Sequence, residues 1–232
     1  MKLSYLVTCC NETDTLERLL TRLDTYVRGT EDEVVILLDT PPNQETLEIT
    51  NKYDKSNPNI RISLHSLDRN YGAHKNYGSS LCKGDWIFQI DGDENPSEEL
   101  LSSIKEVIES NPDVELIFVP RLNEYKGVNE SHAKQWGWKL TYNPRPSLTD
   151  KILGPLVNWP DYQGRIYKRD TERIKWDRKL HEKIVGHNKY SFLPAEEEWA
   201  LYHDKTIEKQ IETNIRYNKI FSEVDNRGHN VI

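Results

Sequence analysis

The chain contains few cysteines, and their placement argues against a domain stabilised by disulfide bonds or by a structural zinc ion. Only 3 of its 232 residues are cysteines, Cys9, Cys10 and Cys82. An odd count with one adjacent pair matches neither a disulfide framework nor the ligand spacing of a zinc site. We therefore expect a hydrophobic core to hold the fold together, and we expect the protein to work in a reducing compartment, the cytoplasm.

Long hydrophobic runs are also absent, which bears on membrane insertion. A membrane-spanning helix needs about 18 or more consecutive apolar residues, and no stretch of the sequence approaches that length. The apolar segment at residues 2–10 is too short for a signal peptide, and Asn11 and Glu12 follow it where small residues would mark a cleavage site. We expect no transmembrane segment, so any membrane contact is expected to be peripheral.

An excess of positive charge is missing from the chain as a whole. The formal net charge is −7, from 31 Lys and Arg against 38 Asp and Glu, which argues against broad, nonspecific binding to nucleic acid. Residues 165–189 are the exception, with nine Lys and Arg against four Asp and Glu. This stretch is either a solvated charged face or a patch that meets an anionic acceptor.

Composition and periodicity favour an α/β chain of one domain. Hydrophobic residues make up 36% of the sequence, enough to fold, and 232 residues can bury one sizeable core. Apolar runs predict strands at residues 2–8, 33–38, 60–64, 86–90 and 115–119, and helical spacing predicts helices at 16–23, 44–54, 73–81, 96–110 and 205–224. This alternation predicts a mostly parallel sheet flanked by helices, with ligands at the carboxyl ends of the strands. After residue 120 the pattern weakens, so residues 121–232 are expected to form a loop-rich half with short strands and a C-terminal helix.

The sharpest chemical feature is a pair of carboxylates at the end of an apolar strand. Asp91 and Asp93 follow the run Phe88-Gln-Ile and are separated by one glycine. Oxygen ligands suit hard cations such as Mg²⁺ and Mn²⁺, and phosphate oxygens complete the shell of many such metals. An Asp-X-Asp triplet is also common in surface turns, so its meaning depends on the residues around it.

Those surroundings resemble glycosyltransferase family 2. Members of the family show an Asn-X-Gly loop, a basic residue and an asparagine at a helix start, a Gly-Asp-aromatic strand entry, and Asp-X-Asp before a proline at a helix cap. The matching stretches here, in the same order, are Asn70-Tyr-Gly72, Lys75-Asn76, Gly84-Asp85-Trp86, Asp91-Gly-Asp93 and Pro96. The resemblance covers residues 1–105. It implies the GT-A fold, a Rossmann-like α/β architecture, with residues 1–120 as the half that binds a nucleotide sugar and residues 121–232 as the acceptor half.

The resemblance also implies which residues bind the donor. The positions that match the family's donor pocket are Thr8, Asn11, Glu12, Asp39, Lys75 and Asp91. The loop at residues 8–12 and Asp39 are expected at the base and ribose, Lys75 near the nucleotide, and Asp91 at the ribose or a metal-bound water. The family often has a second acidic residue after Asp39, where this chain has Thr40, so the identity of the donor's nucleobase stays undecided.

A divalent metal is implied as well. Asp93 corresponds to the family's direct ligand for Mn²⁺ or Mg²⁺, and His203 corresponds to a second ligand, an imidazole that suits Mn²⁺. Because His203 follows an apolar and aromatic run, its other interpretation is a core or turn residue.

The second half resembles a branch of family 2 that includes lipopolysaccharide-core sugar transferases. The matching stretches are Gly164-Arg165, Trp176 and His181-Glu182, followed by His203. Glu182 lies where the family has its catalytic carboxylate, which takes the proton of the acceptor hydroxyl in an inverting transfer. His181 is expected to orient the acceptor or that carboxylate.

The expected function is therefore inverting, metal-dependent transfer of a sugar from a nucleoside-diphosphate sugar, by default a UDP-sugar, to a glycan or lipid-linked acceptor. The basic stretch at residues 165–189 leaves a hydroxymethylated base of viral DNA as an alternative acceptor. A noncatalytic nucleotide- or glycan-binding protein is a second alternative, and it would not need Glu182. A nucleotidyltransferase is disfavoured, because residues 8–12 contain no glycine for a phosphate-binding loop.

Overall fold

The computed structural model describes residues 1–142 and 154–221. Its helices are α1 (Asp14–Val27), α2 (Gln44–Ser56), α3 (Tyr71–Leu81), α4 (Glu98–Ser110), α5 (Glu130–Trp136) and α6 (Ile207–Phe221), with a 3-10 helix at Glu197–Trp199. Its strands are β1 (Leu3–Cys9), β2 (Glu33–Leu38), β3 (Ile60–Leu64), β4 (Trp86–Asp91), β5 (Asn95–Pro96), β6 (Leu116–Lys126), β7 (Leu140–Thr141), β8 (Leu156–Lys168), β9 (Lys175–Asp177), β10 (Lys183–Val185), β11 (Tyr190–Phe192) and β12 (Leu201–Thr206). The mixed α/β architecture confirms the expected fold class.

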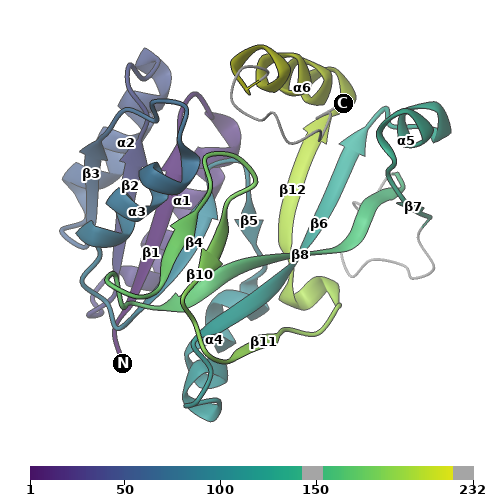
Figure 1. Ribbon diagram of the computed structural model, residues 1–232. Helices are drawn as coiled ribbons and strands as arrows, with labels where there is room; N and C mark the ends of the chain where they lie inside the picture. The colour runs from purple at the N-terminus through teal and green to yellow at the C-terminus, as the bar shows by residue number, and fades with distance from the viewer. Residues whose placement is uncertain (143–153, 222–232) are drawn as a thin grey trace.

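One curved sheet forms the centre of the molecule (Figure 1). Within the described residues its strand order is β3-β2-β1-β4-β8-β6-β12-β5, with β11 also paired to β6 and β7 to β8. The strands β3, β2, β1 and β4 run parallel, so their carboxyl ends meet at one edge of the sheet. Every residue of β2 is buried. This burial on both faces is why the strands read as continuous apolar runs in the sequence.

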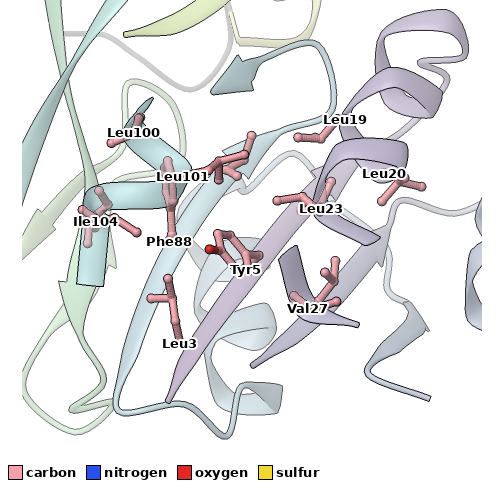
Figure 2. Close-up of a cluster of buried hydrophobic side chains, with 14 of the residues drawn as sticks. Leu3, Tyr5, Leu19, Leu20, Leu23, Val27, Phe88, Leu100, Leu101 and Ile104 are labelled. Carbon is pink, nitrogen blue, oxygen red and sulfur yellow. The ribbon is translucent and has the colours of Figure 1, made fainter. Parts of the chain in front are cut away.

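Helices α1 and α4 cover one face of this sheet, as Figure 2 shows. The apolar residues of α1 recur at helical spacing and are fully buried: Leu16, Leu19, Leu20, Leu23 and Val27. They pack with Leu3 and Tyr5 of β1 and with Phe88 of β4, and α4 adds Leu100 and Ile104 to the same cluster. Burying each leucine side chain contributes about 1.5–3 kcal/mol to folding.

Helix α3 and the hairpin β9–β10 cover the opposite face. Leu6 of β1 and Leu37 of β2 pack there with Trp176 and Ile184 of the hairpin. Gly78 lets α3 approach the sheet closely, because a Cβ atom at this position would lie 2.8 Å from Leu6 Cδ1. The hairpin therefore packs into the same hydrophobic core as the parallel strands, although it lies about a hundred residues after α3 in the sequence.

The second half contains longer strands than the sequence predicted. We expected a strand at 115–119 and weak structure beyond it, but β6 continues through Pro120 to Lys126 and β8 spans 13 residues. Proline cannot donate a ladder hydrogen bond. On the edge of β6 away from β8, residues 116–118 pair with β11 and residues 121–126 pair with β12. Pro120 lies at this change of partner, where the strand tolerates it.

Helix α6 follows β12 directly and lies beyond its carboxyl end (Figure 1). The sequence predicted this helix at residues 205–224, close to the observed bounds. Searching residues 1–142 and 154–221 finds no helix with the length and apolar character needed to cross a membrane.

Candidate active site

The carboxyl ends of the parallel strands open into a cleft of about 680 Å³, a size typical of ligand pockets. All ten residues that the sequence singled out line it: Thr8, Asn11, Glu12, Asp39, Lys75, Asp91, Asp93, His181, Glu182 and His203. In the first half they come from β1 and β4, from the segments that directly follow β1, β2 and β4, and from α3; in the second half they come from the β9–β10 hairpin and β12. Residues of α6 close another side, namely Lys209, Glu212, Thr213 and Tyr217.

Asp91 is held by hydrogen bonds and cations from several elements. Its Oδ2 accepts from Arg165 at 2.6 Å, and its Oδ1 accepts from Thr8 and Gln89, each at 2.8 Å. The ammonium of Lys75 lies 3.3 Å from the same Oδ1. Burial alone would raise the pKa of Asp91, but Arg165 and Lys75 hold it well below its usual range. Asp91 is therefore a fixed anion at the floor of the cleft.

Asp93 faces His203, and the hydrogen bonds behind the ring fix its tautomer. Asn123 donates from Nδ2 to Asp161 at 2.9 Å and to the Val157 carbonyl at 3.2 Å, so its Oδ1 is left to accept. That oxygen lies 2.7 Å from Nδ1 of His203, which must donate. Burial lowers the pKa of His203. The neutral ring then turns the lone pair of Nε2 toward Asp93 Oδ2, 3.3 Å away.

Two acceptors that face each other this closely are stabilised by a cation, and this donor set suits a divalent metal. A carboxylate oxygen and an imidazole nitrogen are both ligands for Mn²⁺, and an outer hydrogen bond that fixes the imidazole tautomer is typical of metal sites. Across residues 1–142 and 154–221, no group of three or more His, Cys, Asp or Glu side chains is arranged to hold a metal ion. Asp93 and His203 are the two side chains here that would hold such a metal.

Lys205 supplies positive charge at the same carboxylate. Its Nζ lies 2.9 Å from Asp93 Oδ2. Burial would raise the pKa of Asp93, but positive charge beside it, including the ammonium of Lys205, holds it well below its ordinary value. Asp93 is therefore ionised, and a lysine stands beside the atoms that suit a metal.

Glu182 lies across the cleft on the turn between β9 and β10. Its Oε1 accepts from Lys75 Nζ at 2.7 Å, and that ammonium also lies 4.6 Å from the centre of the Trp176 ring. Burial would raise the pKa of Glu182, but Lys75 lowers it below its usual value. The carboxylate is ionised at neutral pH and is able to accept a proton. His181 is next to it, exposed, with its backbone in the left-handed region at φ 53°.

After β1 and β2, the polar side chains that line the cleft accept hydrogen bonds from backbone amides. Asp39 Oδ1 accepts the amides of Thr40 and Leu67, each at 2.8 Å. Glu12 accepts the amide of Cys10 at 2.6 Å, and Asn11 accepts the amide of Asn43 at 3.3 Å. These contacts order the loops after β1 and β2, while the side chains still line the cleft.

Several lining residues were not predicted as site residues. Arg121, Gln163, Arg165 and Lys205 all reach the cleft from β6, β8 and β12. The sequence carries a signal for some of them, because Asp161, Gln163 and Arg165 alternate along β8 and therefore share a face. His74 also lines the cleft; its buried ring lies with Nδ1 3.2 Å from Nδ1 of His65, and burial lowers its pKa.

Comparison with known proteins identifies the family. Residues 4–174 match the model of "Glycosyl transferase family 2". A poly(ribitol-phosphate) beta-glucosyltransferase of Bacillus spizizenii is 27% identical over 161 residues, which is 67% of this chain and 24% of that protein. An uncharacterised glycosyltransferase of Methanocaldococcus jannaschii is 26% identical over 138 residues, or 53% of this chain and 47% of that protein. The chain thus spans less than half the length of either relative.

Solved structures share the fold. The crystal structure of S. aureus TarS aligns with a TM-score of 0.57 at 20% identity, covering 99% of this chain and 41% of that one. TarS 1–349 in complex with UDP-GlcNAc aligns with a TM-score of 0.55 at 19% identity, covering 88% of this chain and 59% of that one. With the family model, the motifs and this fold in agreement, the chain belongs to glycosyl transferase family 2 and has the GT-A fold.

Proposed function

We propose that this chain transfers a sugar from a nucleoside-diphosphate sugar, by default a UDP-sugar, to an acceptor hydroxyl with inversion at the anomeric carbon. The observation that carries the proposal is the position of Lys75, which contacts Asp91 in the first half at 3.3 Å and Glu182 in the second at 2.7 Å. A donor-side carboxylate and a candidate base therefore share one cleft. Because both halves build this cleft, we also propose that residues 1–232 act as a single catalytic domain.

The donor nucleotide is proposed to lie along the ends of β1 and β2. Asp39 and Glu12 present carboxylates that accept hydrogen bonds from ribose hydroxyls or from the N–H groups of a base. Thr8 and Asn11 flank them in the same cleft. TarS 1–349 has been solved in complex with UDP and with UDP-GlcNAc, and this likeness of fold supports UDP as the default.

The diphosphate is proposed to lie near Asp93. When bound by Asp93 and His203, Mn²⁺ or Mg²⁺ would supply Lewis-acid stabilisation of the leaving diphosphate. Fixed positive charge around this site comes from Lys205 beside Asp93, Arg165 beside Asp91 and Arg121 beside Glu94. Such preorganised charge stabilises an anion as it develops, because the groups need not reorient during the reaction.

Glu182 is proposed as the general base. The acceptor oxygen attacks the anomeric carbon from the face opposite the diphosphate, the bond to the diphosphate breaks, and the hydroxyl proton passes to the Glu182 carboxylate. Lys75 contacts one oxygen of this carboxylate, Oε1. His181, next in the chain, is proposed to orient the acceptor.

The acceptor is proposed to be a glycan, either free or lipid-linked, and of anionic character. The hairpin that carries Glu182 exposes the cations Lys175, Arg178, Lys179 and Lys183, and the relative from Bacillus spizizenii is named for a poly(ribitol-phosphate) acceptor. A hydroxymethylated base in DNA would meet the same charges, so it is the competing outcome of an acceptor screen.

Calorimetric titration with UDP, GDP and CDP, each with and without Mn²⁺, tests the donor site. We expect one nucleotide to bind in a Mn²⁺-dependent manner, and we expect Asp93→Ala to abolish that dependence. The preferred nucleotide then directs a screen of its sugar conjugates against anionic glycans and hydroxymethylated DNA. If none of the three nucleotides binds under either condition, the proposed donor site is wrong.

A further inference from the structure

Within residues 1–142 and 154–221, the hairpin that carries Glu182 forms no strand pairing with the central sheet. In this part of the chain, β9 and β10 pair with each other as a separate two-stranded sheet. A two-stranded ribbon is only marginally stable by itself. Its position over the cleft must therefore come from contacts with neighbouring elements, which include helix α3 as well as the core residues of β1 and β2.

Asn76 of α3 pairs with the backbone of the hairpin in both directions. Its Nδ2 donates to the carbonyl of Trp176, and its Oδ1 accepts the amide of the same residue, each at 2.8 Å. One side-chain amide thus satisfies both backbone polar groups of Trp176, as an adjacent strand would. The two residues are 100 positions apart in the sequence.

The first turn of α3 adds a second contact with the hairpin. The amide of Tyr71, which has no partner within its own helix, donates to the carbonyl of Lys179 at 3.0 Å. A Cβ atom at Gly72 would lie 2.4 Å from the carbonyl oxygen of Arg178. That neighbour is backbone and cannot rotate away, so only glycine lets the hairpin turn lie against α3.

The turn that these contacts hold has an unfavourable backbone. Arg178 and His181 both have positive φ, at 73° and 53°, a region that residues with a side chain rarely adopt. Glu182 follows His181 directly. Strained conformations of this kind persist where the surroundings determine them, and here the surroundings are the start of α3.

We propose that Asn76 and Gly72 are positioning residues for sugar transfer: they fix the β9–β10 hairpin against α3 and thereby hold Glu182 over the cleft. The inference rests on the role of Glu182 in the proposed function. It also assigns a task to the Asn-X-Gly and Lys-Asn stretches, since Gly72 and Asn76 contact the hairpin of the second half. Donor-side and acceptor-side elements are thus tied together by one helix.

Kinetics of Gly72→Ala and Asn76→Ala test the proposal. Both variants should lose kcat by about 10- to 100-fold, the scale on which misplacement of a catalytic group acts, while nucleotide affinity and the donor KM stay within about twofold. Alanine is the better helix former, so a purely helical role of Gly72 predicts no loss. The matched controls are Gly154→Ala, where a Cβ meets no atom of the described residues within 4 Å, and Asn111→Ala, an exposed helix-end asparagine whose side chain donates one hydrogen bond, to the carbonyl of Val107.

Hydrogen exchange of the peptide at residues 172–186 supplies a readout that does not depend on activity. Asn76→Ala should speed exchange there, while the peptides of β1 and β4 keep their protection. Unchanged exchange in the hairpin, or a kcat equal to that of the controls while Glu182→Gln is inactive, would overturn the inference. If Glu182→Gln itself keeps wild-type kcat, the base assignment fails instead, and the exchange data still judge the docking contact separately.

Discussion

Lys75 and Glu182, 107 positions apart, form an ion pair of 2.7 Å across the cleft. The lysine is buried, with its side chain 5% exposed, and its ammonium also lies near Asp91 and over the Trp176 ring. A buried cation between two carboxylates stabilises both anions, and removing it leaves them uncompensated. From the sequence we expected Lys75 near the nucleotide. In the structure it contacts Glu182, the candidate base, and lowers the pKa of that carboxyl group.

Replacing Lys75 is expected to shift the pH profile of the reaction. Lys75 holds the pKa of Glu182 below its ordinary value of 4.5, so Lys75→Met should raise that pKa through burial and the charge of Asp91. A base must be ionised, and the acidic limb of kcat/KM against pH should therefore move to higher pH in Lys75→Met. Lys75→Arg keeps the charge and serves as the control. If the acidic limb does not move in Lys75→Met, then Lys75 does not set the pKa of the base.

The same ion pair makes a prediction for stability. Because the folded-state pKa of Glu182 is depressed, the pair stabilises the fold above the ordinary glutamate pKa and loses that contribution as the pH falls through the folded value. Denaturant midpoints of the wild type and of Glu182→Gln should consequently converge on acidification. If the difference between the two midpoints instead grows toward low pH, the ion pair does not stabilise the fold in the way predicted.

Chelation and mutation can distinguish the contribution of a divalent metal at Asp93 from that of Lys205. Chelation of divalent ions should reduce turnover by about 100-fold or more, as expected when charge stabilisation of a leaving group is lost, and Mn²⁺ should restore it. Lys205→Met should keep the Mn²⁺ requirement, since Asp93 and His203 remain. Turnover that is insensitive to chelation in the wild type and is lost in Lys205→Met would assign the cation role to the lysine alone.

The core of the parallel half is expected to tolerate little loss of volume. Leu23 on α1 is fully buried in the cluster of Figure 2, so Leu23→Ala should cost about 2–5 kcal/mol of unfolding free energy in urea titration. Leu64, 55% exposed at the end of β3, gives the matched control, and Leu64→Ala should cost less than about 1 kcal/mol. Equal costs at both sites would contradict the described packing.

Local pattern predicted the first half well, because β1, β2 and β4 are buried on both faces. The run at residues 34–38 is apolar throughout and is recognisable without knowledge of its neighbours. The second half was harder to predict. Gln163 and Arg165 interrupt the apolar pattern of β8 since they face the cleft. Because of this polarity, the sequence of a 13-residue strand resembled that of a loop.

The cleft residues could be predicted because motif positions follow strand ends, but their pairings could not. Lys75 with Glu182 and Asn76 with Trp176 join segments about a hundred residues apart, and no local pattern encodes such contacts. From the sequence we noted Arg165 in a basic stretch and in the Gly164-Arg165 match to the family, without assigning it a role, yet its guanidinium bonds Asp91 and Glu94, both at 2.6 Å. Charge partners of this kind depend on strand order, which the sequence leaves open.

Glu182→Gln is the most direct test of the reaction. The carboxamide keeps the size of the side chain but cannot take the acceptor proton, so kcat should fall by about 10²- to 10⁴-fold. Nucleotide binding should persist, because the donor carboxylates lie on other elements. Glu196→Gln, an exposed glutamate outside the cleft, is the matched control and should keep wild-type kcat. NMR of the wild-type product should show the anomeric configuration opposite to that of the donor. A retained configuration would rule out single displacement with Glu182 as base, even if the variant proved inactive.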